Sequence, residues 1–462
     1  MSSSSISERM DRLPITSHHR TAIFALAFAY FFEFADLNTF AFAAPGVMKA
    51  WHIAVGSVAF ITSASFGGMF LGAVTAGWLA DAIGRKRALI LTVLCYALFS
   101  LLNAASWNVL SLAAFRFLTG VGLSGMTVTA NTYVSEFFPA NARGKTMGRI
   151  MTVGLVGIPA TAWFARSFVP MAPWGWRAVF VWGSLGLIAL VFVARMKESP
   201  RWLQRRHREA QALRIVEELE ALAAARAAAS SAASSAAAAH VQREPIDYGR
   251  RVPLSRLFEP GERKRTILLL LVWVFQTLGF YGFVAWVPTL LVKHGFSVVH
   301  SLTFASVIAV CNPLGAILAS YLVERFERRW FITVDGVLIA AFGLGFGLSF
   351  QPMAILVFGA LVMLSIQAMA VGLYTYTPEL FPTEVRSTGM GLTYGVGRLA
   401  NVLGPFVVSL LFGAYGYGSV FVYIAACWLA VSAIVGLFGM STTGRSLEAL
   451  HAAAAGREGA AR

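Results

Sequence analysis

The sequence has few charged residues for its length. Of 462 residues, only 13% are Asp, Glu, Lys or Arg, whereas 57% are hydrophobic. A soluble globular domain carries about 25% charged residues, so this chain has too little charge to keep its apolar surface in water. The composition therefore excludes an ordinary soluble protein and indicates one that crosses a bilayer several times.

Acidic residues and cysteines are scarce as well. The chain has 22 acidic and 37 basic residues, a net charge of +15, and its three cysteines lie inside apolar runs. Such cysteines provide neither a disulfide framework nor metal-ligand spacing. The sequence also lacks a phosphate-binding loop, a His/Cys cluster and a nucleophile elbow. We therefore expect no catalytic residues, no metal and no cofactor, and neither an enzyme nor an ATP-driven pump.

Long apolar runs occupy most of the chain. Runs of about 20 apolar residues predict membrane-spanning helices, and their length and glycine content favour helices over barrel strands. Twelve such spans are expected, near 21–44, 55–80, 88–106, 109–136, 145–168, 175–196, 266–291, 299–323, 330–350, 353–380, 388–412 and 417–440. The fold class is therefore all-α and polytopic.

The spans divide six and six around a polar segment that becomes rich in Ala and Ser. We expect this segment to hold short helices and a flexible tether. The predicted organisation is a tail at 1–20, a bundle at 21–196, a linker at 197–265, a second bundle at 266–440 and a tail at 441–462.

Basic residues gather on one side of the predicted spans. The tails, the linker and loops such as 84–87 carry nearly all of them, and the other side holds only Lys49, Arg166, Arg177 and Lys293. Because cytoplasmic loops carry the excess of Lys and Arg, both tails and the linker are predicted to be cytoplasmic. The charge excess thus reflects topology rather than nucleic-acid binding.

The two halves repeat at a fixed offset of 243 residues. Tyr133, Glu136, Pro139 and Arg143 correspond to Tyr376, Glu379, Pro382 and Arg386, and Asp81 and Arg85 correspond to Glu324 and Arg328. Parallel six-helix repeats of this kind are typical of transporters that rock two bundles around a midplane site.

Several motifs resemble those of the major facilitator superfamily over essentially the whole chain. Gly77-x3-Asp81-x2-Gly84-Arg85-Lys86 resembles its loop signature between helices 2 and 3, and Arg116-Phe-x-x-Gly120 resembles its helix 4 signature. Glu198-Ser-Pro200-Arg201 and Pro378-Glu379-Leu-Phe-Pro382 resemble the sugar-porter-like branch. The resemblance implies two six-helix bundles and secondary transport.

The chain departs from true sugar porters in helices 1, 7 and 11. Helix 7 has a single Gln and places Tyr281 where those porters have Asn. Helix 11 carries Arg398, similar to the intramembrane Arg of aromatic-acid and other organic-acid proton symporters. Glu33-Phe34-Ala35-Asp36 is similar to the paired acids of their helix 1, with Glu first and no Gly.

Three charged residues inside the spans are candidates for proton coupling. Ionisable groups within a membrane are costly and mark ion or substrate paths. Asp36 and Glu33 are three residues apart and share a helix face, so either can take and release a proton. Arg116 accompanies proton movement or ties helices 1 and 4 together. The alternative for each acid is a neutral carboxyl that only links helices.

Candidate substrate-binding residues lie mainly in the second half. Arg398 suits a carboxylate, because its planar guanidinium can bind one bidentately; the alternative is a fixed structural partner. Small-ligand sites combine apolar walls with a few polar groups. The further candidates are Gln276, Tyr281, Asn401, Tyr374 and Tyr394.

Charged residues at the predicted helix ends are candidates for gating. A network of ion pairs that forms in only one conformation can bias the equilibrium between outward-facing and inward-facing states. The candidates are Asp81, Arg85, Glu136, Arg143, Glu198, Glu324, Arg328, Glu379 and Arg386.

The leading hypothesis is proton-coupled symport of a small organic anion, aromatic or another carboxylic acid, by alternating access. The expected partners are the substrate, protons and the lipid bilayer, with no nucleic acid. We expect a monomer in the inner membrane of a bacterium. The alternatives are a sugar or polyol–proton symporter, a proton-driven exporter of drugs or metabolites, and a transport-inactive membrane sensor.

Overall fold

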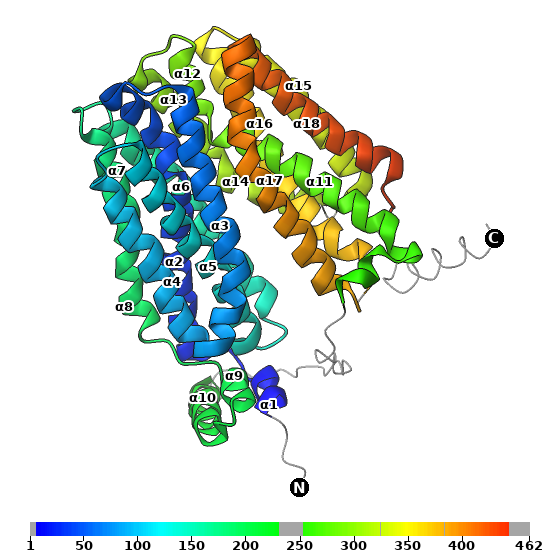
Figure 1. Ribbon diagram of the computed structural model, residues 1–462. Coiled ribbons are helices and arrows are strands. Elements are labelled where there is room, and N and C mark those ends of the chain that lie inside the picture. The colour runs from blue at the N-terminus through cyan, green and yellow to red at the C-terminus, as the bar shows by residue number, and fades with distance from the viewer. Residues whose placement is uncertain (1–5, 231–252, 324, 383, 443–462) are drawn as a thin grey trace, which may run out of the picture.

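The computed structural model describes residues 6–230, 253–323, 325–382 and 384–442. In these ranges, 12 helices are long and apolar enough to cross a membrane. They form two bundles of six spans that lie side by side (Figure 1). The predicted all-α fold class is therefore confirmed.

The first helix of the first bundle begins at Ser17, before the first apolar run. Its elements are α2 (Ser17–Trp51), α3 (Val55–Ile83), α4 (Arg85–Ala104), α5 (Val109–Phe137), α6 (Arg143–Phe168) and a sixth span made of α7 (Gly175–Ser184), η1 (Leu185–Ile188) and α8 (Ala189–Val193).

In the second bundle, one span is divided between two helices, and the short helix α12 follows the first span. Its elements are α11 (Pro260–Val284), α12 (Val287–Lys293), α13 (Val298–Ala309), α14 (Cys311–Val323), α15 (Arg328–Leu348), α16 (Pro352–Leu380), α17 (Arg386–Tyr415) and α18 (Tyr417–Phe438). The eighth span is α13 followed by α14.

The predicted seventh span, 266–291, is wrong at its end. The helix α11 ends at Val284, and α12 begins at Val287 as a separate helix. Pro288 lies in the first turn of α12. Because proline has no backbone N–H to continue a helical ladder, it favours the start of a helix. The apolar composition of 285–291 concealed this break.

Helices of the two bundles pack against each other along their boundary. The helix α17 packs against α3, α12 against α2, and both α13 and α14 against α6. Arg166 of α6 donates a hydrogen bond to Thr303 of α13 at 3.1 Å. In Figure 1 the bundles meet at the end near α12 and α13 and diverge toward the other end. We call that other end, which carries Arg85, Arg143 and Arg328, the basic end.

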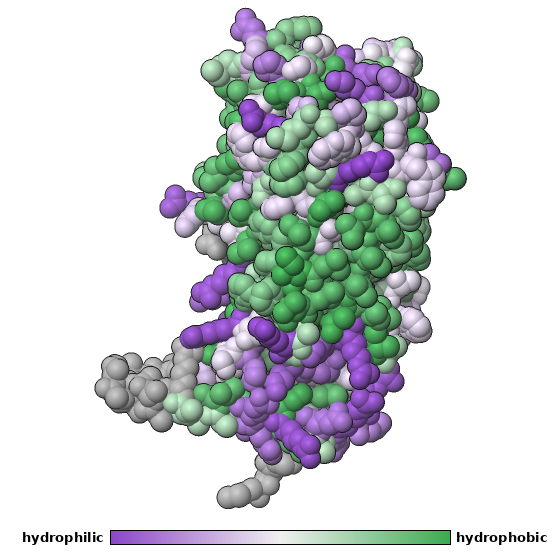
Figure 2. Space-filling model, turned by 90° about the vertical axis from the view of Figure 1, so that its left-hand side faces the viewer, coloured by the Kyte–Doolittle hydropathy of each residue, from purple (hydrophilic) through white to green (hydrophobic). Residues whose placement is uncertain are grey.

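The surface of the molecule follows the same axis. On the face that Figure 2 shows, apolar side chains cover much of the middle, and hydrophilic side chains gather most densely at the basic end. Large apolar side chains on the spans, such as Val74 and Leu110, are exposed on the outside of the bundles. A belt of this kind matches the hydrocarbon layer of a bilayer.

The repeat of 243 residues is visible in equivalent contacts. The hydroxyl of Tyr133 donates to the carbonyl of Lys197, and Tyr376 donates to Met440, both at 2.9 Å. Arg143 likewise donates to the carbonyl of its preceding Phe138, as Arg386 does to Phe381. The two halves are therefore built alike at the level of individual hydrogen bonds.

Three helices outside the spans lie together below the first bundle at the basic end (Figure 1): α1 (Ile6–Arg12), α9 (Pro200–Arg205) and α10 (Glu209–Ser230). Apolar residues of the N-terminal segment and of α10 share one cluster: Ile6, Met10, Leu13, Ala212, Val216 and Leu219. Arg9 binds Glu220 with two hydrogen bonds of 2.9 and 2.7 Å. The N-terminal segment therefore holds the linker helix against this bundle.

The helices α3 and α5 touch through their backbones. A Cβ added at Gly68 would lie 1.8 Å from the carbonyl oxygen of Phe117, and one at Gly120 would lie 2.3 Å from that of Ser65. Small residues allow such close approach within a membrane.

We expect Gly68→Ala to destabilise the protein by at least about 1–3 kcal/mol, because the two helices must separate. Gly77→Ala on the same helix is the matched control, since nothing lies within 4 Å of its added Cβ. Thermal unfolding in detergent measures both variants. Equal melting temperatures for the two would contradict the close packing of α3 and α5.

The Arg9–Glu220 pair predicts that α10 loosens in acid. The hydrogen bond from Arg9 lowers the pKa of Glu220. The pair therefore stabilises the docked helix fully at pH values above the ordinary pKa of a glutamate, and this stabilisation is lost as the pH falls through the lowered pKa. Hydrogen exchange of the α10 amides, corrected for intrinsic pH effects, should then accelerate. At neutral pH, Arg9→Glu should also accelerate exchange, and adding Glu220→Arg should restore protection.

Candidate functional site

Two carboxyl groups lie near the middle of α2 and face the interior of the first bundle. Asp36 is fully buried, and Glu33 is 5% exposed. One oxygen of Asp36, Oδ1, accepts hydrogen bonds from Ser100 of α4 and, at 3.4 Å, from Thr39. Glu33 Oε1 accepts a bond of 2.9 Å from Thr127 of α5. The second oxygen of each carboxyl is buried without a described hydrogen bond.

Arg116 of α5 lies beside Asp36. Its Nη1 is 3.6 Å from Asp36 Oδ2, which is an ion pair without a hydrogen bond. Its hydrogen bonds go to other groups than this carboxylate: Nε donates to Ser65 at 3.1 Å, and Nη1 donates to Thr39 at 3.2 Å and to the backbone carbonyl of Asp36 at 3.4 Å. Burial of a charge without a partner is strongly unfavourable, so Arg116 and the ionised Asp36 stabilise each other.

A pocket adjoins this pair, and its walls come from both halves. Arg116 contributes the charge, and Tyr281 of α11 contributes an aromatic ring. The ring of Tyr281 contacts Phe66 of α3 edge-to-face, with centroids 4.7 Å apart. The lining residues are Leu37, Asn38, Phe40, Ala41, Thr62, Ser65, Phe66, Met69, Arg116, Tyr281, Val284 and Ala285.

Arg398 of α17 reaches across the boundary between the halves. It is half-buried, and its Nη1 donates a hydrogen bond to the hydroxyl of Ser124 on α5. Its charge also acts on Glu33 and on the pocket residue Tyr281. The middle of the membrane region therefore holds two acids of α2 and two guanidinium groups, of which Arg116 lies beside Asp36.

The other predicted substrate-binding residues lie outside the pocket lining. Gln276 accepts a hydrogen bond from Thr277, and Asn401 is buried in α17. Tyr374 and Tyr394 pack against Trp273 at centroid distances of 5.1 and 4.4 Å, in an aromatic cluster of α11, α16 and α17. Of the six predicted residues, the structure thus brings only Tyr281 into the pocket, and their binding roles stay predictions.

Sequence reasoning missed Asn38 and Phe66, which line the pocket. Asn38 had a visible signal, because it is a polar residue two positions after Asp36 in an apolar run. Phe66 had none, since one phenylalanine among many gives no indication of its neighbours. The sequence analysis also passed over Asp335, another buried carboxyl, which lies on α15 and is hydrogen-bonded to Ser365.

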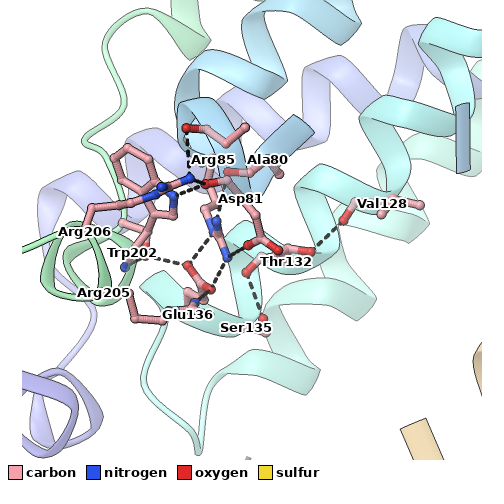
Figure 3. Close-up of polar contacts among 12 residues, drawn as sticks. Ala80, Asp81, Arg85, Val128, Thr132, Ser135, Glu136, Trp202, Arg205 and Arg206 are labelled. Carbon is pink, nitrogen blue, oxygen red and sulfur yellow. Dashed lines mark hydrogen bonds and ion pairs between the residues drawn. The ribbon is translucent and has the colours of Figure 1, made fainter. Parts of the chain in front are cut away.

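Four of the five predicted gating residues of the first half form one network at the basic end: Asp81, Arg85, Glu136 and Glu198. Arg85 is 2% exposed, and it donates two hydrogen bonds of 2.8 Å to Glu136 (Figure 3). Arg205 of α9 and the hydroxyl of Ser199 also donate to Glu136. Asp81 pairs with Arg85 at 2.8 Å from a position that is 58% exposed. The helix α9 is thereby joined to α4 and α5.

Glu198 has a different part in this network. Its carboxylate accepts hydrogen bonds of 2.9 and 3.1 Å from the backbone N–H groups of Arg85 and Lys86, which begin α4. A carboxylate at a helix N-terminus satisfies unpaired donors and complements the helix dipole. Glu198 therefore fixes the start of α4.

The remaining gating candidates are placed less uniformly. Arg328 lies 3.5 Å from Glu379, in the position that Arg85 and Glu136 occupy in the other half. Arg143 pairs with Asp11 at 2.6 Å, so it contacts the N-terminal segment. Glu324 lies outside the described residues. That these groups act as a gate stays a prediction.

Comparison with known proteins identifies the family. The model of the family described as "Sugar (and other) transporter" matches residues 22–454. The chain belongs to this family of the major facilitator superfamily. It is a secondary transporter of metabolites and an integral membrane protein, and not an enzyme.

Relatives of this transporter extend over its whole length. It is 41% identical over 444 residues to the "Putative metabolite transport protein YyaJ" of Bacillus subtilis, covering 96% of this chain and 97% of that one. It is 31% identical to the niacin transporter NiaP of Acinetobacter baylyi, covering 96% and 98%. It is 27% identical to the 4-hydroxybenzoate transporter PcaK of Pseudomonas aeruginosa, covering 87% and 88%.

The fold of the transporter matches a solved structure. The inward open conformation of the xylose transporter XylE from E. coli superposes with a TM-score of 0.73 at 17% identity, covering 93% of this chain and 98% of that one. At this identity the match supports the fold and says nothing of the substrate.

The network at the basic end predicts unequal effects of two substitutions. Glu136→Gln should destabilise the transporter by about 3–5 kcal/mol, because it removes the main partner of a buried Arg85. Asp81→Asn should cost about 0–1 kcal/mol, because an exposed ion pair contributes little. Thermal unfolding compares the two. Equal losses would contradict the central position of Glu136.

Proposed function

We propose that this transporter carries a small organic anion, aromatic or another carboxylic acid, together with protons. The observation that supports this most directly is the charge balance among the charged groups of α2, α5 and α17 in the middle of the membrane region. Asp36, Glu33, Arg116 and Arg398 sum to zero when all are ionised. An anion that binds among them leaves one uncompensated negative charge in a medium of low dielectric, and protonation of one carboxyl removes it.

Arg398 is the proposed carboxylate-binding group. It comes from the second half, reaches the first half at Ser124, and acts on the pocket residue Tyr281. A guanidinium group binds a carboxylate through charge-assisted hydrogen bonds. Asp36 and Glu33 are the proposed proton carriers, since each has a buried oxygen without a described partner.

Named relatives support the substrate class. They include transporters of niacin, 4-hydroxybenzoate, gallate and benzoate, at 25–31% identity. Each of these compounds has a carboxyl group on a flat ring. We extend this chemistry to the present chain as a proposal.

The basic end is the proposed cytoplasmic end, in a bacterial cytoplasmic membrane. The excess of Lys and Arg there supports this orientation. The ion pairs Arg85–Glu136 and Arg328–Glu379 each lie within one half. We propose that these clusters re-pair during alternating access and so bias the equilibrium between the two states.

Uptake into proteoliposomes under an imposed pH gradient tests this function. With the outside acidic, labelled nicotinate and 4-hydroxybenzoate should accumulate above the level in protein-free liposomes, which corrects for passive entry of the neutral acids. Labelled xylose should not. Accumulation of xylose alone would favour a sugar–proton symporter, and expulsion of the acids by the gradient would favour an exporter.

Arg398→Gln should weaken binding of the transported acid by roughly 10–100-fold, because charge-assisted hydrogen bonds contribute about 1.5–3 kcal/mol. Arg329→Gln is a matched control, since Arg329 donates to the carbonyl of Gly436 away from the pocket. Isothermal titration of the purified variants measures both. Unchanged affinity in Arg398→Gln would assign Arg398 a structural role.

A further inference from the structure

We propose that Arg116 is a second arm of the anion site, and that Asp36 and the substrate carboxylate compete for its guanidinium group. This inference rests on the proposed function and adds to it a residue and a coupling mechanism. Arg398 then approaches the substrate from one half of the protein and Arg116 from the other.

The hydrogen bonds of Arg116 leave part of its guanidinium group for a ligand. Those described involve Nε and Nη1, which reach Ser65, Thr39 and the carbonyl of Asp36. Among the described contacts, Nη2 has no hydrogen-bond partner. Because a guanidinium group offers five N–H donors, donors remain for a carboxylate that enters the pocket which Arg116 lines.

The contact between Asp36 and Arg116 is loose enough to be exchanged. Their nearest charged atoms are 3.6 Å apart, whereas a charge-assisted N–H···O bond is about 2.7–2.9 Å long. The oxygen concerned, Oδ2, has no described hydrogen bond, while Oδ1 is held by Ser100. A proton on Oδ2 therefore leaves the Ser100 contact intact and withdraws the negative charge from Arg116.

The surroundings of Asp36 limit which other groups take part. Glu33 lies on the same helix, Tyr96 and Ser100 face it from α4, and Arg116 faces it from α5. On α7, Gly183 lies so close to Asp36 that an added Cβ would be 2.2 Å from Oδ1. Arg116 is thus the cation that stabilises the ionised Asp36, and a second anion at Arg116 has to displace that interaction.

The pocket walls suit a carboxylate on an apolar or aromatic body. Phe66 and Tyr281 meet edge-to-face across the boundary between the halves, and Met69 and Val284 complete the apolar surface. Asn38 and Thr62 add polar groups near Arg116. The ring and the carboxylate of a bound substrate would contact both halves, so a substrate bound beside a protonated Asp36 holds the two halves together. When Asp36 is ionised, its negative charge repels the substrate carboxylate.

Competition predicts a specific pH dependence of binding. Binding of benzoate and nicotinate to the purified transporter in detergent is measured by isothermal titration between about pH 6 and pH 9. On the alkaline side, the wild-type Kd should rise about tenfold per pH unit, because one proton must bind with the anion. In Asp36→Asn, binding should stay tight and independent of pH, because Arg116 is permanently available.

Arg116 is tested in the same experiment. Arg116→Gln should weaken binding at every pH, and in Asp36→Asn/Arg116→Gln the gain from Asp36→Asn should disappear. Arg116→Lys retains the charge and should recover part of the affinity. Size-exclusion profiles and thermal unfolding show that each variant is folded, and any one folded variant of Arg116 suffices for the comparison.

Asp335→Asn is the matched control, since it removes a buried carboxyl of the other bundle. It should leave the pH dependence of the wild type unchanged. A wild-type pH dependence that persists in Asp36→Asn would overturn the competition, and so would an unchanged affinity in Arg116→Gln. Failure of the wild type to bind any carboxylate at any pH would instead reject the proposed function itself.

Discussion

Burial of charge in a medium of low dielectric is the constraint on which this structure depends. Asp36 and Arg116 are both shielded from solvent at the centre of the first bundle and lie 3.6 Å apart. Without Arg116 the carboxylate of Asp36 would be a buried, unpaired charge, and without Asp36 the permanently charged Arg116 would be one. Their pairing requires α2 and α5 to keep a fixed register, and the serine and threonine hydroxyls around them complete the polar interior of an otherwise apolar bundle.

Close backbone contact between α3 and α5 also helps to position Arg116. The glycines of α3 and α5 bring these helices together, so that Ser65 of α3 reaches the guanidinium group of Arg116. At the basic end, Glu136 gathers Arg85, Arg205 and Ser199, and Glu198 fixes the start of α4. The charges at the end of the bundle therefore hold the same helices whose middle carries the buried pair.

The boundary between the halves has a different character. Few polar contacts are described across it: Arg398 donates to Ser124, and Arg166 donates to Thr303. Aromatic and apolar side chains provide much of the remaining contact around the pocket. Interfaces of this kind can separate and re-form while the buried Asp36–Arg116 pair stays within one half, which suits the proposed alternating access.

The sequence by itself determined the twelve spans, the two halves and their repeat. The length of an apolar run and the placement of charges are local properties, and the thickness of the bilayer and its preference for cytoplasmic Lys and Arg act on them directly. The sequence also singled out Asp36, Glu33, Arg116 and Arg398, since each charge is exceptional in its apolar run. Only the tertiary structure decided the partners. It placed Arg116 rather than Arg398 beside Asp36, brought Asn38 and Phe66 into the pocket, moved Tyr374 and Tyr394 into a separate aromatic cluster, and broke the seventh span at Val284. These outcomes depend on which helix faces meet, and helix packing involves residues far apart in sequence that no local pattern relates.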